Sequence, residues 1–430
     1  MTSDRRALVV WGVAVAAYVV AVMNRSSFGV ATIEVTELYG VSSALLATMA
    51  VAQLVVYALL QVPVGVLLDR YGPRVLVATG AGVMALGQAV LALAPSAGLV
   101  LAGRVLVGAG DALTFVSVVR LVPAWFAVHR VPLMTQLTGS LGQVGQVLSA
   151  VPLVALLHAQ GWRTTFLSVA AVGVVACVAV LAVVRDAPAP AAEPAGRGGR
   201  RVGLLERRRA ARTRPLRQPG ALRAVLRDPG ARLAFWMHFS GQFSNHVVVL
   251  LWGYAFFVEG QGRTPGEASA LLTVNVVAAV VAGPLVGLLV GRHPRARTPL
   301  AVGTLLAVGV AWLAVAVPSR PVPLGVLVVF VVVVAVGGPT SLVAFDVARS
   351  CTPPARLGTA TGFVNTGGFV GALATMLVVG VVLDRVGGEV RDLEAFRAAF
   401  AWVALPWAVG MLGMLLGRGP ARRAHPGLAV

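Results

Sequence analysis

The sequence predicts an all-α membrane protein with twelve transmembrane helices in two pseudo-symmetric six-helix bundles. Three observations predict this class. Hydrophobic residues make up 58% of the 430-residue chain and charged residues only 12%, whereas a soluble domain carries a charged fraction of about 25%. Apolar runs long enough to cross a hydrocarbon core of about 30 Å recur along the chain. The basic residues, all of them arginine, gather on alternate loops.

The apolar runs are interpreted as helices because only helices and closed barrels satisfy every backbone hydrogen bond in lipid. Small residues, including many of the 49 glycines, would let these helices approach one another closely. The first six runs fall near residues 8–32, 44–68, 75–96, 98–121, 135–158 and 164–184. The second six fall near residues 233–258, 268–291, 299–317, 322–348, 358–383 and 395–417.

The loops between the predicted helices alternate in charge, and this alternation predicts the orientation. One set carries Arg5, Arg6, Arg70, Arg74, Arg130, a dense central run, Arg292, Arg295, Arg297, Arg349, Arg356, Arg418, Arg422 and Arg423. The other set carries only Arg163, Arg263, Arg320, Arg385, Arg391 and Arg397. Basic loops stay in the cytoplasm. We therefore expect a protein of the plasma (cytoplasmic) membrane with both termini cytoplasmic, and a net charge of +19 that faces lipid headgroups rather than nucleic acid.

Short internal repeats predict the domain organisation. Val64-Gly-Val-Leu-Leu-Asp-Arg70 aligns with Val286-Gly-Leu-Leu-Val-Gly-Arg292, and Thr138-Gly139 aligns with Thr361-Gly362. We expect an N-terminal bundle over 1–184, a basic cytoplasmic linker over 185–232, and a C-terminal bundle with a short cytoplasmic tail over 233–430. Parallel halves of this kind place a binding site at their interface, near the middle of the membrane.

The loop after the second helix carries the most specific motif, Gly65-Val-Leu-Leu-Asp-Arg-Tyr-Gly-Pro-Arg74. Gly65 permits close helix contact, Gly72-Pro73 favours a tight turn, and Asp69 can face the positive end of a neighbouring helix. A purely structural reading, a well-formed turn with topology charges, is the alternative.

This loop resembles the signature loop of the major facilitator superfamily, and Arg104-x-x-x-Gly108-x-Gly110 fits that family too. The resemblance covers essentially the whole chain. It implies the major facilitator fold, a monomer, and alternating access between inward-open and outward-open states. It also implies a gating rather than a substrate-binding role for Gly65, Asp69, Arg70, Gly72, Arg74 and Arg104.

Two charged residues interrupt predicted helices. Arg25 follows Asn24 within the first helix, and Asp111 lies near the middle of the fourth. Charges at such depth are expensive and normally face a cavity or a partner. Arg25 could instead reach back to the membrane surface, and Asp111 could be a structural hydrogen-bonding group. If the two residues pair, a proton on Asp111 would free Arg25, whose guanidinium suits carboxylates and phosphates.

Asn24-Arg25 together with Gly108-x-Gly110-Asp111 resembles the anion–cation symporter branch of the superfamily. The resemblance implies that Arg25 binds an organic anion and that Asp111 carries the coupled proton. One departure concerns Asn24, because the branch often has an acid at this place and an amide cannot titrate. Coupling would then be weaker, different or absent.

Polar stripes at helical spacing predict the rest of the binding site. The seventh helix carries His238, Gln242, Asn245 and His246, and His246 is a second candidate for proton coupling. Polar contact between helices is the alternative for each of these residues. The other candidate substrate ligands are Asn24, Gln53, Tyr57, Gln143 and Asn365.

The predicted function is therefore secondary active transport, with proton-coupled symport of a small organic anion as the first hypothesis. The second is efflux of a drug or metabolite by proton antiport, although Gly139-Ser-Leu-Gly-Gln-Val-Gly145 departs from the Gly-Pro-x-x-Gly-Gly motif of drug–proton antiporters. The third is a non-transporting receptor or scaffold. No enzyme motif, cofactor or metal-ligand spacing is found. The expected partners are the substrate, protons and membrane lipids.

Overall fold

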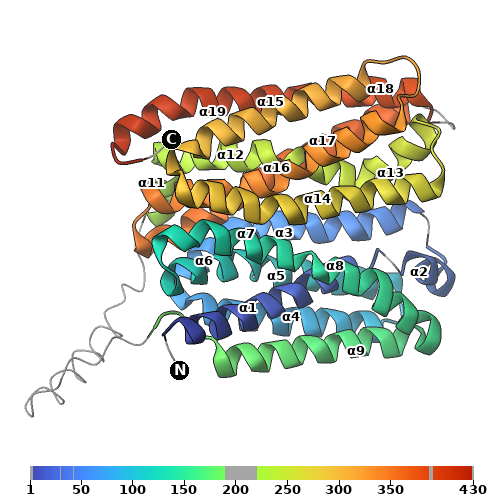
Figure 1. Cartoon of the computed structure of the whole chain (residues 1–430). Helices are drawn as coiled ribbons and strands as arrows, with labels where there is room; N and C mark the ends of the chain where they lie inside the picture. Colours follow the sequence, from blue (N-terminus) through green and yellow to red (C-terminus); the bar gives the residue numbers. More distant parts are fainter. Residues whose placement is uncertain (1–2, 30, 42, 189–219, 387–390, 429–430) are drawn as a thin grey trace, which may run out of the picture.

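The computed structural model describes residues 3–29, 31–41, 43–188, 220–386 and 391–428, and these residues are almost entirely helical. Two stacked layers of long helices make up the molecule (Figure 1). The first layer contains α1 to α9 and the second contains α11 to α19. Both chain termini lie at the same end, at the left in Figure 1.

Six transmembrane helices and the short α2 form the first layer. Their bounds are α1 (Ser3–Ser26), the short α2 (Thr32–Tyr39), α3 (Ser43–Tyr71), α4 (Pro73–Leu93), α5 (Ala97–Ala112) continued by α6 (Phe115–Trp125), α7 (Val131–Gly142) with α8 (Val144–Leu148), and α9 (Val154–Val183). Gly161 divides α9 because its φ of 73° is not helical. The part before Gly161 completes the fifth transmembrane helix through a π-helical turn at Ser149–Leu153, and the part after it is the sixth.

The second layer begins with the short α11 (Ala221–Arg227), which leads into the seventh transmembrane helix. That helix joins α12 (Pro229–His246) and α13 (Gly253–Ala255) through π-helical segments at Val247–Trp252 and Phe256–Gly260. The others are α14 (Pro265–Arg292), α15 (Arg297–Ala316), α16 (Leu324–Cys351), α17 (Leu357–Val386), and α18 (Leu393–Ala401) with α19 (Ala404–Ala424). Each half thus supplies six transmembrane helices within the described residues, and the predicted fold class is confirmed.

Length and apolarity alone identify ten candidate spans in the described part of the chain, and these spans cover all of the crossings but one. The stretch Val128–Val183 contains two crossings that meet at Gly161, and the polar seventh helix falls outside the apolarity criterion. The predicted boundaries at 184 and 233 stay predictions. Most of the predicted linker, residues 189–219, lies outside the described residues.

One end of the helices carries the arginine-rich turns, and we call it the basic end. Here α3 turns into α4 between Arg70 and Arg74, α7 is preceded by Arg130, and α14 ends at Arg292. The turns after α1, after α15 and within α9 lie at the opposite end. Positions along the cavity are described below as nearer the basic end or nearer the opposite end.

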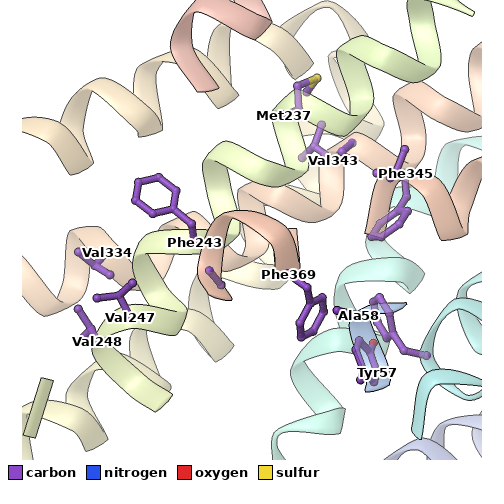
Figure 2. Close-up of a cluster of buried hydrophobic side chains, with 14 of the residues drawn as sticks. Tyr57, Ala58, Met237, Phe243, Val247, Val248, Val334, Val343, Phe345 and Phe369 are labelled. Carbon is purple, nitrogen blue, oxygen red and sulfur yellow. The ribbon is translucent and has the colours of Figure 1, made fainter. Parts of the chain in front are cut away.

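Small residues bring the helices of each layer into contact. A Cβ placed on Gly110 would lie 2.6 Å from the carbonyl oxygen of Gly80, and one on Gly241 would lie 2.8 Å from that of Gly337. Such contacts, rather than apolar burial, drive association between helices in lipid. The largest apolar cluster crosses from one layer to the other, where Tyr57 of α3 lies beside Phe369 of α17 with ring centroids 4.4 Å apart (Figure 2).

Candidate transport site

A cavity of about 420 Å³ lies between the two halves. Both halves contribute to its wall, which contains most of the polar residues predicted for the site. The predicted substrate ligands on the wall are Arg25, Gln53, Tyr57, Gln143, His238, Gln242, Asn245 and Asn365, together with the predicted proton carrier His246. Gly29, Gln146 and Leu250 extend the wall toward the opposite end.

Arg25 of α1 and Asp111 of α5 form an ion pair beside this cavity. The Nη1 atom of Arg25 lies 3.2 Å from Oδ2 of Asp111. The side chain of Arg25 is 23% exposed to the cavity, whereas that of Asp111 is fully buried, and its Oδ1 atom has no hydrogen-bond partner among the described residues. The guanidinium therefore faces the space that a ligand would fill, and the carboxylate lies behind it.

Arg104 also lines the cavity, although the sequence placed it with the gating residues. Its Nη2 atom lies 3.4 Å from the carbonyl oxygen of Arg25, and its guanidinium lies 4.5 Å from the ring centroid of Phe28. Arg104 is only 3% exposed, and within the described part of the chain its Nε and Nη1 atoms have no hydrogen-bond partner. Because Asp111 neutralises one of the two guanidiniums, these three residues carry one net positive charge.

The spacing of seven residues along one helix places Arg104 and Asp111 two turns apart on the same face. Glycines between them let the helix pack closely enough to bury that face. A Cβ on Gly108 would lie 2.5 Å from the carbonyl oxygen of Gln53 in α3, and one on Gly110 would meet α4. The Arg104-x-x-x-Gly108-x-Gly110 motif thus places Arg104 on the cavity wall and packs its glycines against α3 and α4.

The second half contributes hydrogen-bonding groups rather than fixed charges. Ser341 of α16 donates a hydrogen bond of 2.9 Å to Oε1 of Gln242. His238 Nδ1 lies 3.1 Å from the carbonyl oxygen of Ser341, and His246 Nδ1 lies 3.1 Å from that of Gln242. Two imidazoles and an amide of α12 are therefore fixed on the side of the cavity that faces Arg25 and Arg104.

Two amides of the first half differ in their availability to a ligand. Gln53 is buried, and both polar atoms of its side-chain amide lack hydrogen-bond partners in the part of the chain that the structure describes. Gln143 accepts a hydrogen bond of 2.7 Å from Gln146.

Asn24 was expected among the ligands but does not line the cavity. Its amide donates to the carbonyl oxygen of Val20 at 2.7 Å within α1, because the next residue along a helix points to another face.

The floor of the cavity is a hydrogen-bonded junction between α3 and α17. Asn365 donates to Oε1 of Gln61 at 2.7 Å and to the hydroxyl of Tyr57 at 3.3 Å. Farther toward the basic end, a Cβ on Gly362 would clash with the carbonyl oxygen of Gln61, so the two backbones touch. A ligand in the cavity would have to separate this junction to leave through the basic end.

Asp69 closes the same junction at the basic end. Its carboxylate accepts hydrogen bonds from Gly358 N at 2.6 Å, and from Thr359 N and Thr359 Oγ1 at 2.7 Å each. These donors belong to the first turn of α17, where the helix dipole also favours a negative charge. Gly65 allows the approach, because a Cβ there would lie 2.6 Å from the carbonyl oxygen of Gly358.

The other residues of the predicted gating loop contact neighbouring residues of the loop, the end of α9 or the segment directly after it. Arg74 accounts for two of these contacts: its backbone N–H donates to Asp186 at 2.8 Å, and its side chain donates to the carbonyl oxygen of Leu181. Gly72 has a φ of 80° and is packed against the carboxylate of Asp186. The guanidinium of Arg70 lies 4.9 Å from the ring centroid of Tyr71. Asp69 and Gly65 are thus the loop residues whose contacts reach across to the second half.

Some wall residues were not found from the sequence. Tyr18 precedes Arg25 by two helical turns, and Gln136 precedes Gln143 by the same distance, so seven-residue spacing from a predicted ligand was an available signal. Gln136 also donates a hydrogen bond of 2.7 Å to the carbonyl oxygen of Pro339 in α16, across the halves. Phe115 and Phe28 were missed because an aromatic residue within an apolar run of the sequence gives no indication of the direction in which its side chain points.

Comparison with known proteins supports the same architecture. The chain is 26% identical over 158 residues to the probable L-galactonate transporter of Escherichia coli, covering 37% of this chain and 35% of that protein. It is 28% identical over 127 residues to an uncharacterized transporter of the major facilitator type from Mycobacterium tuberculosis, covering 30% of this chain and 22% of that protein. The matched segments thus span about a third of the length of these relatives or less.

Two solved structures share the fold. The outward conformation of the transporter FucP superimposes with a TM-score of 0.67 at 15% identity, covering 96% of this chain and 99% of that one. A single-substitution variant of the E. coli fucose:proton symporter FucP gives a TM-score of 0.65, also at 15% identity, with coverage of 95% and 98%. The family model of the major facilitator superfamily matches residues 14–264 and 234–429. This chain therefore belongs to the major facilitator superfamily, and it is an integral membrane transporter and not an enzyme.

Proposed function

We propose that this transporter is a symporter, which carries a small organic anion across the membrane together with protons. The observation that carries the proposal is the excess of positive charge around the cavity, where a buried guanidinium has two nitrogens without partners among the described residues. A buried charge is costly unless it is paired. A carboxylate or phosphate in the cavity would relieve that cost through the bidentate hydrogen bonds that arginine favours. A cation would increase it.

The Arg25–Asp111 pair supplies a means of coupling. When Asp111 is ionised it holds the guanidinium of Arg25, and when it binds a proton it releases that guanidinium to a ligand. Protonation therefore raises the net positive charge of the site by one and strengthens anion binding. Linkage is reciprocal, so a bound anion raises the proton affinity of Asp111 by the same factor. Mutual strengthening of this kind is the thermodynamic requirement for symport.

The named relatives agree with this chemistry. One curated relative is named as a probable transporter of L-galactonate, a sugar acid, and a protein with the same fold is named as a fucose:proton symporter. A cavity that combines two arginines with amides and imidazoles suits a polyhydroxylated carboxylate, because its hydroxyls can use the hydrogen-bonding groups of α12.

Alternating access would proceed by rocking of the two halves about this site. The described conformation has the α3–α17 junction joined at the basic end, so we assign it to the state closed on that side. We place the basic end in the cytoplasm because arginine-rich loops stay there. The state is then outward-facing, and the protein resides in the cytoplasmic membrane with both termini inside.

A binding experiment on purified protein tests the proposal. A panel of sugar acids, other carboxylates and sugar phosphates is screened by thermal shift. The best carboxylate ligand is then titrated between about pH 5.5 and pH 8, where a carboxylate of pKa about 3.5–4 stays ionised. Wild-type affinity should rise as the pH falls. Asp111→Asn should bind with an affinity that no longer depends on pH, because its side chain is permanently neutral.

Arg104→Gln tests the charge that receives the anion. A hydrogen bond to a charged group contributes about 1.5–3 kcal/mol, so the dissociation constant should rise roughly 10- to 100-fold. Arg163→Gln, which changes an exposed arginine at the opposite end, is the matched control and should bind as wild type does. Stabilisation by hydrophobic cations but by no anion would overturn the proposal in favour of proton-coupled efflux.

A further inference from the structure

Three side chains from distant parts of the sequence meet at the basic end of the second half. Asp228 is the N-cap residue of α12, Cys351 is the last residue of α16, and His425 follows the end of α19. One ligand-type atom of each residue lies within 4.8 Å of those of the other two. We propose that this cluster is a binding site for a zinc-class divalent metal ion.

The chemistry of the donor set identifies the kind of ion. A thiolate sulfur, an imidazole nitrogen and a carboxylate oxygen are the ligands of Zn²⁺ sites, and the sulfur disfavours Mg²⁺ and Ca²⁺, which prefer oxygen. The thiolate and the carboxylate together balance the charge of a divalent ion. Three protein ligands leave the fourth tetrahedral position to water, which can reach a site where the side chains of His425 and Asp228 are 24% and 25% exposed.

Close packing fixes two of the three ligands relative to each other. The sulfur of Cys351 lies directly against Gly230, so a Cβ at that position would clash with it. A Cβ on Gly230 would also lie 3.1 Å from Oδ1 of Asp228. Glycine at 230 is therefore what allows the thiol to reach the first turn of α12, beside the carboxylate.

Hydrogen bonds orient the carboxylate for a ligand role. Oδ1 of Asp228 accepts the backbone N–H of Ala231 at 2.8 Å, which is the N-cap interaction of α12. Oδ2 lies 2.8 Å from Nε2 of His425. Oδ1 is thus held by the helix, and Oδ2 is directed at the imidazole. A small increase in the distance between Oδ2 and Nε2 of His425 would admit an ion between these two atoms and the sulfur.

Sequence spacing gave no sign of this site, because the three residues are far apart along the chain and match no metal-binding pattern. All three lie on or at the ends of helices of the second layer, so the ion would tie the end of α19 to α12 and α16. It would stabilise that layer without joining it to the other. Metal binding is then separable from transport, and neither proposal depends on the other.

Cobalt(II) is a suitable probe because it takes the place of zinc and reports on its ligands through its absorption. Full-length protein, purified without a polyhistidine tag, is titrated with Co²⁺ at neutral pH. We expect stoichiometric binding, with a thiolate-to-cobalt charge-transfer band and the intense visible bands of tetrahedral Co²⁺. Zn²⁺ should bleach both, and acidification should release the ion because the ligands must be deprotonated.

Matched variants locate the ion. Cys351→Ser should abolish the charge-transfer band, whereas Cys177→Ser, which alters the cysteine within α9, should leave it unchanged. His425→Gln and Asp228→Asn should each raise the dissociation constant about tenfold or more. Asparagine keeps the N-cap, so the metal-free melting temperature of Asp228→Asn checks that the fold is intact. A cooperative metal-free melting transition in every variant shows that the variant is folded, and so separates loss of a ligand from misfolding.

Two results would overturn the site. One is Co²⁺ binding without a charge-transfer band in the wild-type protein, which would indicate adventitious binding to exposed histidines such as His129 and His293. The other is a rise in melting temperature with Zn²⁺ that is the same in wild type and in a Cys351→Ser/His425→Gln double variant. In either case Asp228 and His425 form an ion pair next to a buried thiol and hold no metal.

Discussion

At the scale of single residues, Asp69 makes the clearest link between the two halves. Its carboxylate accepts three hydrogen bonds from the first turn of α17, two from backbone N–H groups and one from the hydroxyl of Thr359. An ionised acceptor roughly doubles the strength of such bonds. When the basic end opens, these donors and the carboxylate must separate, so Asp69 specifically stabilises the conformation closed at that end.

Asp69→Asn should therefore shift the population toward the conformation open at the basic end. The amide has one acceptor oxygen instead of two, and its NH₂ group would face backbone donors. We expect a loss of about 1–2 kcal/mol, which changes the ratio of the two states by about 5- to 30-fold.

Spin labels at Tyr71→Cys, the last residue of α3, and at Ala355→Cys, just before α17, would measure the distance between these two helices in a background without native cysteines. Both positions are exposed. Asp384→Asn, which removes an exposed ion pair with Arg391 at the opposite end, is the control and should leave the distance distribution unchanged. An unchanged distribution for Asp69→Asn would show that the carboxylate does not hold the junction.

At the scale of helices, the internal repeat places equivalent glycines at two equivalent junctions. A Cβ on Gly65 in α3 would lie 2.6 Å from a carbonyl oxygen of α17. A Cβ on its repeat partner Gly287 in α14 would lie 2.8 Å from Cα of Leu133 in α7. The junctions differ in one respect, because Asp69 has a glycine, Gly291, as its counterpart. The α3–α17 junction therefore combines close packing with charged hydrogen bonds, and the α7–α14 junction lacks the counterpart of that carboxylate.

Gly65→Ala and Gly287→Ala should each destabilise closure at the basic end. A methyl group at these distances cannot fit without movement of the opposing backbone, and overpacking of this kind costs about 1–3 kcal/mol. Gly303 in α15 is the matched control, because among the described residues a Cβ there would have no packing neighbour within 4 Å beyond the adjacent backbone of its own helix.

The measurement is the rate at which a thiol reagent, supplied from the basic end, labels a cysteine introduced into the cavity by Gln53→Cys. This labelling rate should rise when Gly65→Ala or Gly287→Ala is added, and Gly303→Ala should leave it at the value of Gln53→Cys alone. If the two junction variants react at the parent rate, the close glycine contacts do not limit opening.

How far the sequence predicts these elements depends on what each signal encodes. Apolar runs predicted the transmembrane helices because the length of a run is set by the thickness of the membrane. The charges of Arg25 and Asp111 predicted that each side chain faces a cavity or a partner. The direction of a side chain around a helix was harder to predict. Asn24 and Arg25 are neighbours, yet only Arg25 reaches the cavity. The motif of Arg104 predicted gating, which stays a prediction, and its position two turns before Asp111 was a signal that it lines the cavity.

At the scale of the whole molecule, the two halves contribute different chemical groups to the cavity. The first half supplies both guanidiniums, the carboxylate paired to Arg25 and several amides, and the second supplies the imidazoles and amides of α12 together with Asn365. A ligand that bridges the two sets would draw the halves together around it. Since the cavity wall reaches the opposite end at Gly29 and Leu250, closure on that side is the movement that a bound anion would favour.

The orientation of this movement in the membrane rests on the positive-inside rule, and a matched pair of cysteines tests it. Arg295 and Arg320 are exposed residues on consecutive turns of the second half, the first at the basic end and the second at the opposite end. In a background lacking Cys177 and Cys351, a membrane-impermeant maleimide added to intact cells should label Arg320→Cys and spare Arg295→Cys. Permeabilised cells should label both, which confirms that each thiol is reactive. The reverse pattern in intact cells would place the arginine-rich turns outside, and Asp69 would then close the outer side of the transporter.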